Sequence, residues 1–277
     1  MVSRAGKIVG YTVLVIVLAV IVGFAVAWLV ASGKNYERRE VKPGMTYTVG
    51  ERTYKVPDLP LKSKAYFLKE EYLLAQRELF LCLTQLLDNH KIEHWCSGGT
   101  LLGFIRHGTV MPWDDDLDMH THADNRQKLF SPWFGEACLK VGLKAFRLAG
   151  TSAASAPTRE GGGVRVKLDG RDIPVCDIFF VDRMEKDKDK KYTTRIAKID
   201  SWTKRRTTFN KKERWKQTDL FPIQKKDIDD MKVPVPANPK AVLEQQYGPT
   251  ALTEMYGRPL VFSHEFVFSL PVWREIK

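Results

Sequence analysis

WCSGGTLLGFIRHGTVMPWDDDLDM, residues 95–119, is the segment around which the rest of the chain is organised. It holds a turn of small residues, a short basic segment and a cluster in which four of the five positions 114–118 are Asp. Carboxylates this close together repel one another, and folding them needs a cation, solvent or protonation. A solvated acidic turn is one interpretation. The neighbouring side chains favour burial, and this context favours a metal site: Trp113, Leu117 and Met119.

The chain here predicts a strand, a glycine turn and a helix in succession. Ile92 to Cys96 is a short strand, Ser97-Gly98-Gly99 is the turn, and Thr100 to His107 is a short helix. Glycines let a backbone approach an anion, and the free N–H groups at a helix start point towards it. This order of elements therefore predicts a phosphate-binding geometry close to the carboxylate cluster.

The acidic cluster itself predicts metal ligands. Asp116 and Asp118 alternate with apolar residues, so on a strand both project from the same face. Two such carboxylates suit Mg²⁺, which prefers hard oxygen ligands and leaves positions for substrate phosphates. Asp114 lies on that face too if the strand begins early, and Asp115 is expected to point away.

Asp177 is a further candidate, because it lies inside the apolar stretch 173–181. A buried charge without a partner costs several kcal/mol. The turn at Asp169-Gly170 joins this stretch to an alternating strand at 164–168, which predicts a hairpin. A metal ion shared with the two carboxylates of the earlier strand resolves the burial of Asp177. A salt bridge to an arginine is the alternative.

Two further helices and a loop are predicted. Residues 63–89 repeat apolar side chains every three to four positions, with Ser63 as the N-cap. Pro239 to Gln246 is the second helix, with Gly248 as its stop. Residues 151–157 are small and predict a loop, either a lid over a site or a simple linker.

The N-terminal part is predicted to consist of a short tail (1–7), a transmembrane helix (8–31) and a stem or linker (32–62). Residues 8–31 are free of charge and long enough to span a bilayer, which favours an uncleaved anchor over a cleaved signal peptide. Lysine and arginine flank both ends, so charge does not fix the orientation. The stem contains prolines and mixed charge, with a short hairpin expected around Val49-Gly50.

The charge distribution and the cysteine spacing limit the possible classes of function. The net charge is +11, and residues 183–226 hold sixteen Lys/Arg and six Asp/Glu, which gives +10 of it. Basic residues interleaved with aromatic ones can bind nucleic acid, but a charged helical insertion or an acceptor-binding role is preferred. The cysteines are too widely spaced to indicate a zinc site or a disulfide framework: Cys82, Cys96, Cys138 and Cys176.

Three blocks of the sequence resemble the LicD/fukutin family of the nucleotidyltransferase superfamily. The first joins Gly99-Thr100-Leu101-Leu102-Gly103 and Arg106-His107-Gly108 to the run from Pro112 to Asp118. The second is Val175-Cys176-Asp177-Ile178-Phe179, and the third is Val233-Pro234-Val235-Pro236 followed by Leu243 and Tyr247-Gly248. The resemblance covers residues 66–259. It implies an α+β fold, a nucleotidyltransferase-like mixed sheet flanked by helices, after one transmembrane helix.

The resemblance implies Mg²⁺- or Mn²⁺-dependent transfer of a phospho-alcohol, such as phosphocholine or ribitol phosphate, from a CDP-activated donor to a glycan hydroxyl. CMP is the other product. By position, the metal ligands would be Asp116, Asp118 and Asp177, with Asp114 as an auxiliary carboxylate. The residues that receive donor phosphates would be Gly98, Gly99 and Thr100. Arg106 would neutralise a phosphate, and His107 would contact the donor or orient the acidic turn.

The implied catalytic domain, residues 63–277 with the basic insertion at 183–226, would lie in the lumen of the Golgi or ER. The protein would be a single-pass, type II membrane protein, and its membrane attachment argues against a nucleic-acid substrate. Two alternatives stay open: a template-independent nucleotidyltransferase that extends a polymer, and a non-catalytic scaffold of a glycan pathway. The scaffold is disfavoured because three converging carboxylates destabilise the fold, and a scaffold has no need of them.

Overall fold

The structure is a computed structural model that describes residues 17–18, 22, 36–148, 163–171, 173–183, 191–194, 198–199, 206–207, 214–257 and 274–276. Most of the predicted transmembrane helix lies outside these ranges, as do the predicted loop at 151–157 and much of the basic segment. Within the described ranges, no helix combines the length and the apolar character needed to cross a membrane. The anchor at 8–31 stays a prediction.

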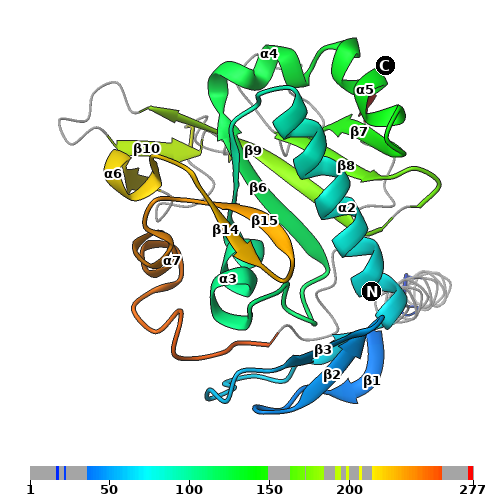
Figure 1. Cartoon of the computed structure of the whole chain (residues 1–277), viewed down its shortest axis with the longest axis vertical. Helices are drawn as coiled ribbons and strands as arrows, with labels where there is room; N and C mark the ends of the chain where they lie inside the picture. Colours follow the sequence, from blue (N-terminus) through cyan, green and yellow to red (C-terminus); the bar gives the residue numbers. More distant parts are fainter. Residues whose placement is uncertain are drawn as a thin grey trace, which may run out of the picture.

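A mixed sheet forms the centre of this α+β fold (Figure 1). Its described strands are β5 (His94–Cys96), β6 (Asp116–His122), β7 (Leu143–Arg147), β8 (Gly163–Leu168), β9 (Val175–Arg183), β10 (Lys191–Thr194), β13 (Arg214–Lys216) and β16 (Arg274–Glu275). The path runs β13-β10-β9-β8-β7-β16, and β6 joins it by pairing with β9 and with β5. β6 and β9 are parallel, whereas the other pairs are antiparallel.

Helices flank the sheet as predicted. The long helix α2 crosses the sheet over β6, β9 and β8, and α3 lies against β6 and α7 (Figure 1). The bounds of the helices are α2 (Glu70–Asn89), α3 (Gly98–His107), η1 (Ala123–Asn125), α4 (Arg126–Leu129), α5 (Pro132–Leu139), α6 (Gln217–Leu220) and α7 (Pro239–Tyr247). The predicted helices around α3 and α7 and the predicted β8–β9 hairpin are confirmed, with ends shifted by one or two residues.

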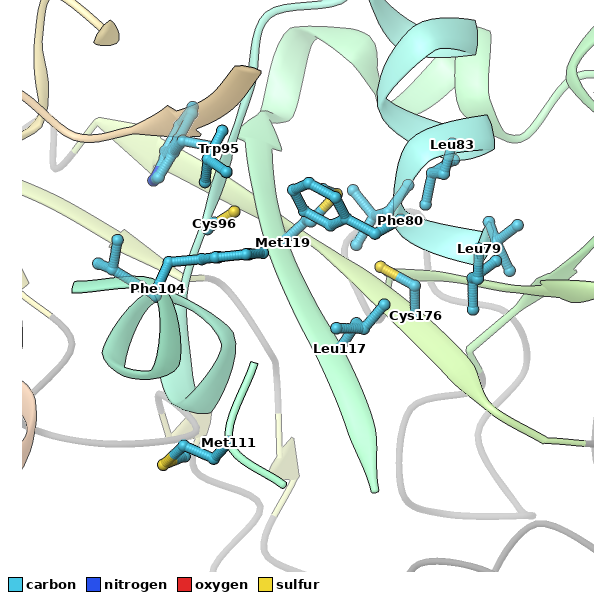
Figure 2. Packing of buried hydrophobic residues seen from close by; sticks show 14 of the residues in the cluster. Leu79, Phe80, Leu83, Trp95, Cys96, Phe104, Met111, Leu117, Met119 and Cys176 are labelled. Atoms are coloured by element: carbon cyan, nitrogen blue, oxygen red, sulfur yellow. The ribbon is translucent and has the colours of Figure 1, made fainter. Parts of the chain in front are cut away.

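The alternation of β6 separates the core from the acidic side chains. Leu117 and Met119 are fully buried, and Figure 2 shows them near Phe80 of α2 and Phe104 of α3. The rings of Phe80 and Phe104 pack with centroids 5.0 Å apart. Asp116 and Asp118 are partly exposed. Because successive strand side chains point to opposite faces, these carboxylates face away from the packed cluster.

The long helix begins later than its periodicity predicts. Residues 66–68 form the strand β4 (Tyr66–Leu68), which pairs with β1 (Tyr36–Glu40), and Lys69 is the N-cap of α2. Phe67 is completely buried on that strand. Burial of the strand against N-terminal residues therefore outweighs the helical period, and the prediction that Ser63 caps the helix is wrong.

Residues 36–62 are not the expected stem or linker. β2 (Thr46–Val49) and β3 (Arg52–Lys55) form the hairpin predicted around Val49-Gly50. Tyr47, Val49 and Val56 are buried in the same hydrophobic cluster as the sheet. The short alternation of Thr46 to Val49 gives one buried face, and that burial outweighs the linker-like composition around it. This segment is part of the folded domain.

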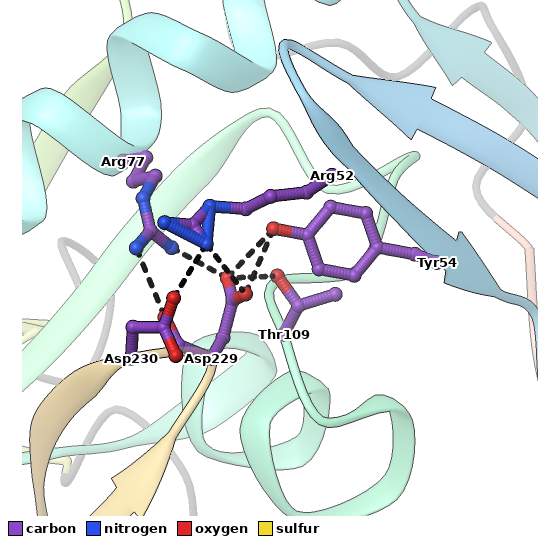
Figure 3. A network of polar contacts seen from close by, with 6 residues as sticks. All are labelled: Arg52, Tyr54, Arg77, Thr109, Asp229 and Asp230. Carbon is purple, nitrogen blue, oxygen red and sulfur yellow. Dashed lines mark hydrogen bonds and ion pairs between the residues drawn. The ribbon is translucent and has the colours of Figure 1, made fainter.

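A polar network fastens this hairpin to distant parts of the chain (Figure 3). Its centre is Asp229, in the turn between β14 (Gln224–Ile228) and β15 (Met231–Val235). Asp229 accepts hydrogen bonds from Tyr54 at 2.9 Å and from Arg77 at 2.5 Å. Arg52 pairs with the adjacent Asp230 at 2.8 Å. Side chains from two segments, β3 and α2, thus converge on one turn far along the chain.

Where it is described, the basic segment contributes mainly strands. β10 and β13 extend the sheet beyond β9, and Trp215 of β13 is buried. β11 (Lys198–Ile199) pairs with β12 (Arg206–Thr207). The only helix in the described part of residues 183–226 is the four-residue α6. The expectation of a charged helical insertion is therefore wrong for these residues, because pairing with the sheet edge takes precedence.

Candidate active site

The acidic residues of β6 and β9 meet because their strands are parallel neighbours. Asp118 and Asp177 are directly opposed in the register, and Asp116 precedes Asp118 by two positions on the same face. Neighbouring strands lie ~4.8 Å apart, so the side chains of two opposed residues begin close enough to contact one another. Three carboxylates from two distant segments therefore share one face of the sheet.

The tightest group of acidic side chains lies at the start of β6. Asp114, Asp115 and Asp116 each place a carboxylate oxygen within 4.8 Å of the other two, and among the described residues this is the only such group of potential metal ligands. Asp115 is 2% exposed, yet it does not turn away from its neighbours as predicted. Residues 114 and 115 precede β6, so the alternation of the strand does not govern them.

The glycine turn lies directly against two of these carboxylates. Gly98 adopts φ +54°, and a Cβ added there would lie 2.6 Å from Oδ2 of Asp118. A Cβ at Gly99 would lie 2.1 Å from Oδ2 of Asp114. Both separations are too short for real atoms, so only glycine lets the carboxylates come this close to the start of α3. The predicted glycine turn thus lies against Asp114 and Asp118, whereas the predicted ligand set Asp116, Asp118 and Asp177 does not appear as a group within 4.8 Å among the described residues.

Thr100 and Ser97 join the start of α3 to β6. The Oγ1 atom of Thr100 accepts a hydrogen bond from the N–H of Asp118 at 2.7 Å. The N–H of Ser97 donates to the carbonyl of Asp118 at 3.0 Å. The first N–H groups of α3 come from Gly98, Gly99 and Thr100, where the helix dipole favours negative charge.

Arg165 of β8 is the immediate partner of Asp177. Its Nε and Nη2 atoms donate to Oδ1 and Oδ2 at 2.7 and 2.5 Å. The side chains of Arg165 and Asp177 are 8% and 9% exposed. The arginine salt bridge considered as the alternative is therefore present. It occupies one lone pair on each oxygen, and a carboxylate offers about four, so Asp177 retains capacity for a metal ion.

The motif-based prediction does not name Arg165, and leaves a salt bridge from Asp177 to an unspecified arginine as the alternative. The β8–β9 hairpin pairs residues symmetrically about position 171, so 165 falls opposite 177. A turn centred on Asp169-Gly170 would instead place residue 162 opposite Asp177, so the predicted turn alone does not locate Arg165.

Arg106 and His107 contact protein groups. The Nη1 atom of Arg106 donates to the carbonyls of Ala251 at 2.9 Å and Glu254 at 2.6 Å, and burial lowers its pKa to about 10. The ring of His107 lies edge-on to Trp113, with centroids 5.1 Å apart. Burial, and then the charge of Arg106, lower the pKa of His107 to about 3. The neutral imidazole can orient the acidic loop, and the predicted phosphate contacts stay predictions.

The donor set fits a hard divalent cation. The crowded groups are carboxylates, the ligands that Mg²⁺ and Mn²⁺ prefer. Burial raises the pKa of the Cys176 thiol well above its usual value, and the negative charges of Asp177, Asp118 and Asp116 raise it further. The four cysteines are all free. A cation at this face would relieve the negative field that these acids create.

Several curated proteins match parts of the chain. The lipopolysaccharide cholinephosphotransferase LicD of Haemophilus influenzae is 45% identical over 51 residues, 18% of this chain and 19% of that protein. The human ribitol 5-phosphate transferase FKRP is 33% identical over 66 residues, 22% of this chain and 13% of that protein. An uncharacterized protein of Rickettsia prowazekii is 25% identical over 188 residues, 66% of this chain and 58% of that protein. The chain thus spans less than two thirds of each relative.

A solved structure and a family model also match parts of the chain. The lincosamide adenylyltransferase LnuA superposes with a TM-score of 0.36 and 16% identity, covering 64% of this chain and 95% of that one. Residues 91–238 match the family described as LicD/FKTN/FKRP, nucleotidyltransferase domain. That range contains the glycine turn, the acidic loop, Arg165 and Asp177. Because the match spans more than half of the 277 residues, the chain belongs to the LicD/FKTN/FKRP family.

Proposed function

We propose that the protein transfers a phospho-alcohol, such as phosphocholine or ribitol phosphate, from a CDP-activated donor to a glycan hydroxyl and releases CMP. One observation carries the proposal: the opposed Asp118 and Asp177, the acidic loop 114–116 and the Gly98-Gly99 turn meet at one place. Relatives named as a cholinephosphotransferase and a ribitol 5-phosphate transferase support this class of reaction.

The carboxylates would hold Mg²⁺ or Mn²⁺. The ligands in this proposal are Asp116, Asp118 and Asp177, with Asp114 as an auxiliary carboxylate. When bound, the ion supplies charge neutralisation for the diphosphate of the donor. Arg165 keeps the charge of Asp177 compensated and its carboxylate aligned with the opposed strand.

The start of α3 would bind the donor phosphates. Its first N–H groups come from Gly98, Gly99 and Thr100 and have no partner within the helix, and the two glycines let the carboxylates of Asp118 and Asp114 lie against this helix start. Phosphoryl transfer depends mainly on positioning and charge neutralisation. The acceptor oxygen bonds to the phosphorus of the phospho-alcohol, the bond from that phosphorus to CMP breaks, and a carboxylate takes the hydroxyl proton. Asp114 and Asp177 are the two candidates for this base.

The activity is tested with full-length protein, Mg²⁺ and a panel of CDP-choline, CDP-ribitol and CDP-glycerol, each with and without glycan acceptors. The measured quantity is released CMP. We expect release with one donor and a loss on the order of 100-fold in Asp118→Asn. Asp88→Asn, the same chemical change on the exposed end of α2, is the matched control and should keep activity. No release with any donor, or equal release from both variants, contradicts the proposal.

We also propose that residues 8–31 anchor the protein with its catalytic domain in the lumen of the Golgi or ER. Support comes from the length of the charge-free segment. The proposed location also argues against nucleic acid as the substrate. In intact vesicles the domain should resist added protease until detergent opens the membrane. Digestion before detergent is added would place the domain on the cytoplasmic side.

A further inference from the structure

Two side chains of α2 hold the main chain of the acidic loop. The Nε2 atom of Gln76 donates to the carbonyl of Asp114 at 2.7 Å. The hydroxyl of Tyr72 donates to the carbonyl of Asp115. Positions i and i+4 lie on one face of a helix, so α2 presents both donors to consecutive carbonyls of the loop. Both contacts are made to main-chain oxygens and not to the carboxylates of Asp114 and Asp115.

The two carbonyls before these are also held. The N–H of Leu68 donates to the carbonyl of Pro112 at 2.7 Å. The hydroxyl of Tyr36 donates to the carbonyl of Trp113 at 3.5 Å, the longest contact of the set. Four consecutive carbonyls, from residues 112 to 115, therefore have partners from β1, β4 and α2. A loop held in this way has little freedom to turn its carboxylates aside.

Gln76 lowers the stability of the fold at its position. It is completely buried, and its Oε1 atom has no hydrogen-bond partner among the described residues. Burying an amide with one unsatisfied oxygen costs stability, whereas Met or Leu would fill the same helix face without that cost. Tyr72 is 5% exposed and also brings a polar group into the core. What both residues supply beyond packing is the donor to the loop.

We propose that Tyr72 and Gln76 are positioning residues that hold the loop 112–116 so that its carboxylates face the glycine turn. This inference rests on the function proposed above. Ligands held in place before a metal ion arrives bind it more tightly, because less conformational freedom is lost on binding. The two donors act on the metal site through the backbone of Asp114 and Asp115, without touching the ion or the substrate.

The test compares full-length Tyr72→Phe and Gln76→Met with the control Tyr54→Phe. The control removes a hydroxyl that donates to Asp229, in the network away from the acidic loop. Two quantities are measured: deuterium uptake of the peptide covering 111–119, and the affinity for Mn²⁺ alone from electron paramagnetic resonance. We expect faster uptake in the loop and Mn²⁺ affinity weakened about fivefold to tenfold in Tyr72→Phe and Gln76→Met, with neither change in Tyr54→Phe.

The outcomes separate this inference from the proposed function. Unchanged loop uptake, or uptake that rises equally in helix α7, overturns the positioning role. Faster loop uptake with unchanged Mn²⁺ affinity overturns it as well. A wild-type protein that binds no Mn²⁺ and releases no CMP contradicts the proposed function. In that case the loop exchange alone still decides whether the two side chains fix the loop.

Discussion

Replacing Arg165 by methionine should destabilise the protein strongly, because it leaves the charge of Asp177 buried without its partner. The two side chains are 8% and 9% exposed and share two short hydrogen bonds. Removing one member of a buried ion pair costs about 3–5 kcal/mol. Arg165→Met should therefore lower the urea midpoint of unfolding by an amount that corresponds to this range.

A double-mutant cycle identifies the cause. Asp177→Asn added to Arg165→Met removes the uncompensated charge, and we expect a coupling energy of about 2–3 kcal/mol between the two positions. Lys225→Met breaks the exposed pair with Asp88 and serves as the control, with a cost below about 1 kcal/mol. A cost of less than 1 kcal/mol for Arg165→Met, or no recovery in the double variant, would show that the lost ion pair is not the cause.

The same double variant separates two roles of Asp177. If this carboxylate takes part in the reaction, the folded Arg165→Met/Asp177→Asn protein should release no CMP from any CDP-activated donor. If Asp177 only pairs with Arg165, the double variant should keep its activity. Near-ultraviolet circular dichroism checks that the packing of the double variant matches that of the wild type.

Three further predictions concern single positions. Gly98→Ala should weaken Mn²⁺ binding at least tenfold, because the new methyl group meets Oδ2 of Asp118 and φ +54° is unfavourable for alanine; unchanged binding by titration would contradict this. Burial lowers the pKa of His120 to about 3, so the unfolded chain binds the proton more readily and stability falls as pH drops below about 6.5. His120→Phe should reduce the loss of unfolding free energy between pH 7.5 and 5.5 by about 1.4 kcal/mol, and an unchanged pH dependence in urea titrations would speak against this assignment. Asp230→Gly should raise the urea midpoint slightly, because glycine accepts φ +59° and the ion pair with Arg52 is exposed; a lowered midpoint would show that the pair matters more than the backbone.

Local patterns in the sequence predict the centre of the fold well. The alternation of β6 and the apolar run of β9 indicate strands, and their carboxylates project to one face because strand side chains have a period of two. The glycine turn next to the acidic loop follows from residue types alone. The register that opposes Asp118 to Asp177 is a long-range property that no local pattern gives, and the resemblance to a known family implies only that the two carboxylates share a site.

Other features have no local signature. The pairing of β1 with β4 joins residues 26 to 32 positions apart, and the periodicity of the following helix does not indicate it. The hydrogen bonds from Gln76 to the acidic loop and from Arg106 to the C-terminal turn join distant segments in the same way. Asp115 approaches its neighbours because a loop, unlike a strand, sets no alternation. Such contacts follow from the packing of whole elements.

Direct titration of Mn²⁺ into the full-length protein tests the metal-dependent account most directly. The wild type should bind Mn²⁺ tightly, and Asp118→Asn should lose this binding while its melting temperature stays equal or rises, because one repelling charge is gone. Asp88→Asn should bind as the wild type does. Equal binding by wild type and Asp118→Asn, or no binding by the wild type, would contradict a metal site built from the carboxylates of β6 and β9.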